Sequence, residues 1–141
     1  MYRYLTACVF ALSSLLLGAC ATDNLRSKQK ILDDTLQSYA ATLRWGDITQ
    51  GDAFVDPKLR EQHPLSALDR ARYKQVKVSN YDEQPVVPIS DGEVRQDVQI
   101  GLINVNTQIV RSIVDHQVWH YDDKAKRWWL TSGLPDIKRS E

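Results

Sequence analysis

The sequence predicts an α+β domain in which a long N-terminal helix and shorter helices pack on a curved, mostly antiparallel sheet of four strands. Apolar residues recur at helical spacing early in the chain, whereas after residue 73 they alternate singly with polar ones. The connections between the alternating runs are short and rich in turn-forming residues, which favours antiparallel neighbours. Helices come first and strands follow, which is the order typical of α+β folds.

The first expected element is a helix that begins at Leu25 and ends at Trp45. Asp23 or Asn24 can cap its start, and Gly46 suits the position after its last turn. Its apolar positions step by seven, four, three and four residues, which places them on one face. This stripe consists of Leu25, Leu32, Leu36, Tyr39 and Leu43, flanked by Ile31, Ala40 and Trp45.

Shorter helices and then strands are expected after the long helix. Asp47 can cap a short helix that ends at residues 56–57, and residues 58–72 form a broken helical stretch in which Pro64 restarts a turn. The expected strands are residues 74–81, 93–104, 107–121 and 126–132. A loop that contains Pro85 and Pro88 separates the first strand from the second.

Residues 1–19 are predicted to be a signal peptide. Arg3 is their only charged side chain, and the apolar run behind it is shorter than the roughly 20 residues of a membrane-spanning helix. Residues 17–20, Leu-Gly-Ala-Cys, resemble the lipobox of bacterial lipoprotein precursors. The resemblance implies cleavage between Ala19 and Cys20 and attachment of lipid to the Cys20 thiol, with three acyl chains as a stable membrane anchor. An ordinary secreted protein whose cleavage site ends in cysteine is the alternative.

The residues after the lipobox predict the location and the domain organisation. By resemblance to the lipoprotein sorting rule, Ala21 in place of an aspartate implies the outer membrane, with the domain facing the periplasm. We expect residues 20–24 to form a tether, residues 25–133 to form one domain, and residues 134–141 to form a polar, mobile tail.

Composition narrows the function classes. Removal of residues 1–19 takes away Arg3 and leaves a net charge of −1, without the basic excess that a nucleic-acid partner requires. Cys8 leaves with the signal peptide and Cys20 is lipidated, so the mature chain holds no thiol for a disulfide, a zinc site or a nucleophile. We expect no cofactor.

For the alternative hypothesis of an enzyme, the candidate catalytic residues are His116, Asp97 and Asp115. His116 is the expected base, and either aspartate could orient it. No metal site is expected, because four residues of a strand span roughly 13 Å and His116 and His120 cannot share one ion. We expect the long helix to cover the strand face that carries His116, which consists of Val110, Val114, His116, Val118 and His120.

The candidate interaction residues are Trp119, Arg127, Trp128 and Trp129. Trp128 and Trp129 are adjacent on an expected strand, so their side chains point to opposite faces. One of them should pack under the long helix, and the other is a large aromatic beside an arginine, which is typical of an interface hot spot. Trp119 should lie on the uncovered face with it.

The chain resembles the NTF2-like (cystatin-like cone) superfamily through residues 39–54 (YAATLRWGDITQGDAF) and through the final strand Arg127-Trp128-Trp129-Leu130. The resemblance spans residues 25–132 and implies a concave sheet face that carries an acid–base pair in the members that are enzymes. Other members bind ligands or proteins, so the fold does not select a function. The alternative fold has two helices and then three strands, as in small accessory lipoproteins of the β-barrel assembly machine.

The leading hypothesis is a non-catalytic structural or protein-interaction lipoprotein of the cell envelope, with an envelope protein as its partner. It depends on the lipobox, the balanced charge and the lack of a catalytic signature. The alternative is an NTF2-like binder of a small apolar ligand, or an enzyme that acts on one.

Overall fold

The computed structural model describes residues 17–138, with side chains from residue 25 onward. Most of the predicted signal peptide, residues 1–16, lies outside the described residues, as do residues 139–141. The helices are α2 (Leu17–Trp45), the 3-10 helix η1 (Ile48–Phe54), α3 (Pro57–Gln62) and α4 (Ala67–Tyr73). The strands are β1 (Val76–Glu83), β2 (Val87–Ser90), β3 (Glu93–Asn104), β4 (Val110–Asp122) and β5 (Arg127–Leu130).

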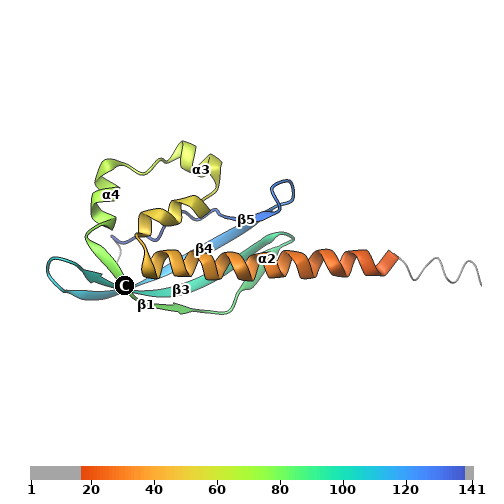
Figure 1. Cartoon of the computed structure of the whole chain (residues 1–141), viewed down its shortest axis with the longest axis horizontal. Coiled ribbons are helices and arrows are strands. Elements are labelled where there is room, and N and C mark those ends of the chain that lie inside the picture. Colours follow the sequence, from red (N-terminus) through yellow and green to blue (C-terminus); the bar gives the residue numbers. More distant parts are fainter. Residues whose placement is uncertain (1–16, 139–141) are drawn as a thin grey trace, which may run out of the picture.

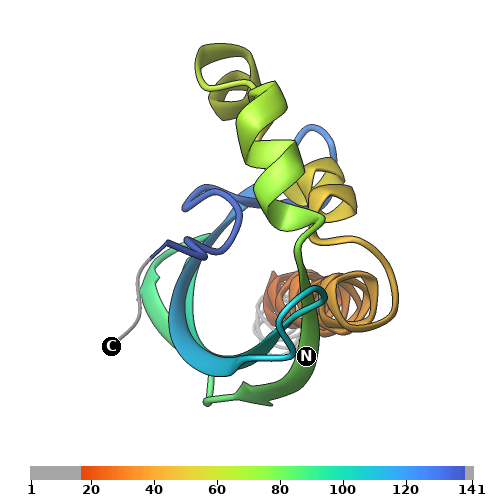
Figure 2. The same ribbon diagram turned by 90° about the vertical axis from the view of Figure 1, so that its left-hand side faces the viewer.

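The predicted α+β fold, with its helices first and a curved antiparallel sheet after them, is confirmed. The main path of the sheet is β1-β3-β4-β5, and all of its strand pairs are antiparallel. The sheet curls into a half-barrel, and α2 runs along its open side (Figure 2). Because α2 contacts both β1 and β5, it bridges the two ends of this path and encloses the core.

One strand lies where a loop was expected. Residues 87–90 form β2, which pairs with β3 near the start of that strand. Pro88 is tolerated there because proline, which lacks a backbone N–H, is compatible with a strand at the edge of a sheet. All four residues of β2 are exposed.

Helix α2 begins at Leu17, eight residues before the expected start, so the expected tether of residues 20–24 is helical. Residues 19–25 contain neither Pro nor Gly, and nothing in this stretch breaks the helix. The N-terminal part of α2 extends past the end of the sheet (Figure 1). Four stripe residues are buried as predicted, but Leu25 on this N-terminal part is 64% exposed and the terminal Trp45 is 82% exposed. The four buried residues are Leu32, Leu36, Tyr39 and Leu43.

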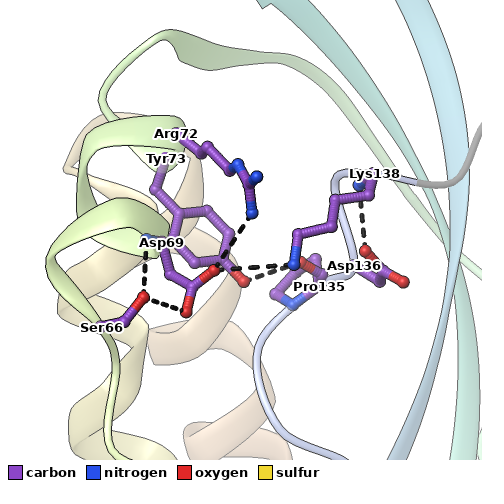
Figure 3. A network of polar contacts seen from close by, with 7 residues as sticks. All are labelled: Ser66, Asp69, Arg72, Tyr73, Pro135, Asp136 and Lys138. Carbon is purple, nitrogen blue, oxygen red and sulfur yellow. Dashed lines mark hydrogen bonds and ion pairs between the residues drawn. The ribbon is translucent and has the colours of Figure 1, made fainter.

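The chain beyond Gly133 packs on the domain, contrary to the expected mobile tail. Pro135 and Ile137 are buried, and the Tyr73 hydroxyl donates a hydrogen bond of 3.0 Å to the carbonyl oxygen of Pro135. Figure 3 shows how Asp69 of α4 joins this segment, with its carboxylate 3.6 Å from the Lys138 ammonium. Burial raises the pKa of Tyr73 to about 12, so this hydroxyl stays protonated at neutral pH. The domain therefore extends at least to Lys138.

Candidate functional site

The two faces of β4 have roles opposite to those expected. His116 and His120 lie on the exposed outer face, whereas Trp119 and Tyr121 lie on the inner face that α2 covers. The large rings bury far more apolar surface than valine side chains do, so their face becomes the core face. Strict alternation along a strand then carries Asp115 inward as well, where it is only 7% exposed.

The structure brings His116 and Asp97 together, but on an open surface. They are cross-strand partners on β4 and β3, and Nδ1 of His116 lies 2.8 Å from Oδ1 of Asp97. The Nε atom of Arg95 lies 3.9 Å from the same carboxylate oxygen. The His116 side chain is 63% exposed, so water surrounds the pair, and the expectation that the long helix covers the His116 face is wrong. Asp115, the other candidate partner, points to the opposite face.

A buried polar cluster on the inner face centres on Gln117, which is fully buried. Its amide Nε2 donates hydrogen bonds of 2.9 Å to the Tyr81 hydroxyl and of 2.9 Å to Oδ2 of Asp115. Its Oε1 accepts a 3.2 Å hydrogen bond from the indole N–H of Trp119. Both amide hydrogens of Gln117 are therefore used, and its orientation is determined by three partners from the same face of the sheet.

Burial raises the pKa of the Asp115 carboxyl to about 6, although the hydrogen bond from Gln117 and the charge of His116 act in the opposite direction. The Tyr39 hydroxyl from α2 is also buried, and it has no hydrogen-bond partner within the described part of the chain. Gln117, Tyr81 and Tyr39 are not among the site residues that the sequence predicts. The available signal was the two-residue spacing of Ile113, Asp115, Gln117 and Trp119, which places all four side chains on one face of a strand.

Aromatic side chains fill the space between α2 and the inner face of the sheet. Tyr39 and Trp119 are both 0% exposed, and their rings meet edge to face with centroids 5.2 Å apart. The ring of Phe54 from η1 meets Tyr39 from another side at 5.4 Å. Such edge-to-face contacts are favourable packing for aromatic rings. The centre of the half-barrel is therefore occupied by the protein's own side chains.

Of the four candidate interaction residues, Arg127 is exposed and Trp129 is half-buried, so these two can reach a partner. Trp119 is in the core, and Trp128 is buried with its indole N–H donating a 3.1 Å hydrogen bond to the carbonyl oxygen of Lys28. The expected exposure of Trp119 is therefore wrong, while the expected packing of one of the paired tryptophans under α2 is confirmed. Trp129 lies on the outer face, and the Arg127 guanidinium stacks 3.8 Å from the centre of its ring.

A hollow of about 500 Å³ lies beside Trp129. It forms where the β4–β5 turn, the β2–β3 turn, the start of α3 and α2 meet, and His120, the cross-strand neighbour of Trp129, lines it. The lining carries charges of both signs, so it suits a polar surface better than an apolar ligand. The charged residues are Lys28, Asp56, Lys58, Asp91, Asp122, Asp123 and Lys124.

None of the helices in residues 17–138 is long and apolar enough to cross a membrane. The same residues contain no group of three or more His, Cys, Asp and Glu side chains placed to hold a metal ion. No family model, curated protein or solved structure matches the chain.

Proposed function

We propose that the protein is an outer-membrane lipoprotein, anchored through Cys20, whose periplasmic domain is a non-catalytic protein-interaction module of the cell envelope. The observation that carries the proposal is the filled interior of the half-barrel. Tyr39 and Trp119 are fully buried and occupy the space in which a cone-shaped enzyme of the resembled superfamily would bind its substrate. The one histidine–aspartate pair on β3 and β4 lies on the outer surface.

The surface around Trp129 is the part of the domain best suited to a protein partner. A half-buried tryptophan beside an exposed arginine combines an accessible apolar area with a charged group, and both residue types are enriched at interface hot spots. The stack of Arg127 on Trp129 orders both side chains before binding, which lowers the entropy lost when a partner immobilises them. The adjoining hollow offers a recess for a side chain of the partner.

Site-specific photo-crosslinking in living cells tests this surface. We expect a photoreactive amino acid in place of Trp129 to crosslink to one discrete envelope protein. The matched control replaces Lys77, which is exposed on β1 at the other edge of the sheet, and should give no such product. Equal crosslinking patterns at the two positions, or none at either, would contradict a partner surface at Trp129.

A second candidate function is favoured by the buried polar cluster. An NTF2-like ligand binder or enzyme would place polar groups inside the half-barrel, as Asp115, Gln117 and the unpaired Tyr39 hydroxyl are placed here. This candidate requires a ligand to displace packed aromatic rings. Isothermal calorimetry with small apolar compounds separates the candidates, because a saturable heat that Asp115→Asn abolishes would favour ligand binding.

A further inference from the structure

We propose that the β4–β5 turn docks on anionic phospholipid headgroups of the membrane that carries the lipid anchor. The basic tip, defined as Lys124, Lys126 and Arg127, forms the contact surface. This inference rests on the proposed attachment of lipid to Cys20 and adds an orientation for the domain.

The first step is the position of the turn relative to the anchor. Cys20 and Lys28 belong to the same helix, and eight residues at 1.5 Å each separate them by only about 12 Å along its axis. The β4–β5 turn is joined to this part of α2, because the Lys28 ammonium pairs with the Asp123 carboxylate at 3.3 Å. The indole N–H of Trp128, just after the turn, donates to the carbonyl oxygen of the same Lys28.

The second step is the direction in which the turn faces. Figure 1 shows the β4–β5 turn at the end of the sheet from which the N-terminal part of α2 emerges, and the β3–β4 turn at the opposite end. Lipid on Cys20 therefore brings the β4–β5 turn toward the membrane and keeps the β3–β4 turn away from it. The Debye length at physiological salt is about 8 Å, shorter than this separation of about 12 Å along α2, so the charges of the turn act on the headgroups once the domain tilts the turn onto the membrane surface.

The third step is the charge that the turn presents. Of its two acidic residues, Asp123 pairs with Lys28, whereas Asp122 keeps its negative charge and accepts hydrogen bonds from the backbone N–H groups of Lys124 and Ala125. Three basic side chains against this one carboxylate leave the turn with a net positive charge. The side chains of Lys124, Lys126 and Arg127 are exposed. The neighbouring β2–β3 turn carries Asp91, so the positive surface is confined to the basic tip.

Anionic headgroups are the chemistry that complements this surface. Each lysine or arginine near an anionic membrane strengthens binding by about fivefold, so a surface of three is effective only for a domain that is already anchored. The near-neutral net charge of the chain is compatible with docking on anionic headgroups, because docking depends on the charge at the basic tip.

The test uses the full-length lipidated protein, reconstituted into vesicles of phosphatidylethanolamine alone or of phosphatidylethanolamine with phosphatidylglycerol. A single cysteine for a fluorescent probe is introduced as Ala125→Cys at the basic tip, or as Thr107→Cys in the β3–β4 turn as the matched control. Acrylamide, an uncharged quencher, then reports how exposed each probe is to water.

We expect the probe at position 125 to be protected only in vesicles that contain phosphatidylglycerol, and the protection to disappear at high salt. The double variant Lys124→Gln/Lys126→Gln should weaken docking by about 25-fold and remove the protection. The probe at position 107 should be equally accessible in all samples. Protection that is absent at position 125, or that survives the double variant or pure phosphatidylethanolamine, would overturn the docking proposal.

Mass spectrometry of the same preparation keeps the two proposals apart. A chain without lipid on Cys20 overturns both the anchor and the docking proposal. A lipidated chain whose position 125 is as accessible as position 107 overturns docking alone and leaves the anchored interaction module in place.

Discussion

At the scale of single residues, Asp115 is a titratable side chain in the core, where an uncharged side chain would destabilise the fold less. Its side chain is buried, with the residue 7% exposed, and its hydrogen-bond partner inside the core is the Gln117 amide. Burial without a cation favours the protonated acid, which is why its pKa rises to about 6. At neutral pH the charged form of Asp115 therefore destabilises the folded domain.

The raised pKa predicts how stability depends on pH. Between the unfolded pKa of about 3.9 and the folded pKa of about 6, the native state binds more protons than the unfolded state, so the free energy of unfolding falls as pH rises. The total loss is about 3 kcal/mol and is complete above the folded pKa. Asp115→Asn, which can still accept from Gln117, should lack this loss and should be more stable than wild type at pH 7 but not at pH 4.

Urea unfolding at both pH values measures the effect, with Glu83→Gln on the exposed end of β1 as the control. The control should change stability by the same small amount at both pH values. An Asp115→Asn variant that is less stable than wild type at pH 7 would show that the carboxylate is stabilised by a partner. If crosslinking at position 129 persists in Asp115→Asn, the cluster is structural and does not serve the partner surface.

At the scale of elements, α2 links the proposed anchor residue Cys20, the core and the edges of the sheet. Its stripe packs into the half-barrel, its Lys28 carbonyl holds the N–H of Trp128, and its contacts with β1 and β5 close the open side. The short helices are defined by local caps. Asp47, Asp56 and Ser66 each accept a hydrogen bond from a backbone N–H of the helix that follows.

The docking of α2 predicts a large cost for truncating its stripe. Leu36 is 7% exposed in the core cluster, so Leu36→Ala should lower the free energy of unfolding by about 2–5 kcal/mol. The neighbouring residue Gln37 points to solvent, and Gln37→Ala should be nearly neutral. Chemical denaturation of both variants makes the comparison, and similar losses in the two would mean that α2 does not pack on the sheet through this stripe.

At the scale of the whole molecule, the proposed anchor residue Cys20 and the domain are joined by one continuous helix. Because Cys20 lies within α2, the proposed point of lipid attachment and the folded domain are connected by helical backbone. The C-terminal segment through Lys138 completes the same domain, tied to α4 by Asp69 and Tyr73 (Figure 3). A domain built in this way has a restricted range of orientations at a membrane surface.

The anchor itself predicts the outcome of Cys20→Ser. Serine offers no thiol for thioether formation, so the variant should take up no lipid and its precursor should accumulate unprocessed. Metabolic labelling with a fatty-acid analogue, followed by membrane fractionation, measures both effects, and Cys8→Ser is the matched control that should label normally. Label retained by the Cys20→Ser variant would refute the lipobox interpretation.

The sequence by itself determined the fold class, the residues of β3, the Asp47 cap of η1 and most of the α2 stripe. These features depend on interactions that are local along the chain: helical spacing, strand alternation and hydrogen bonds between residues a few positions apart. The same alternation correctly placed His116 and Trp119 on opposite faces of β4, and Trp128 and Trp129 on opposite faces of β5.

Only the tertiary structure decided which face of β4 is covered. The covered face is the one whose side chains together bury more apolar surface against α2, and this depends on both elements at once. The valine face that looked apolar in sequence stays outside, and the rings of Trp119 and Tyr121 bring Asp115 and Gln117 into the core. Packing across the fold also buries Ile137 in a stretch that looked like a polar tail. The joining of Lys28 to the β4–β5 turn links residues almost a hundred positions apart, and no local pattern encodes it.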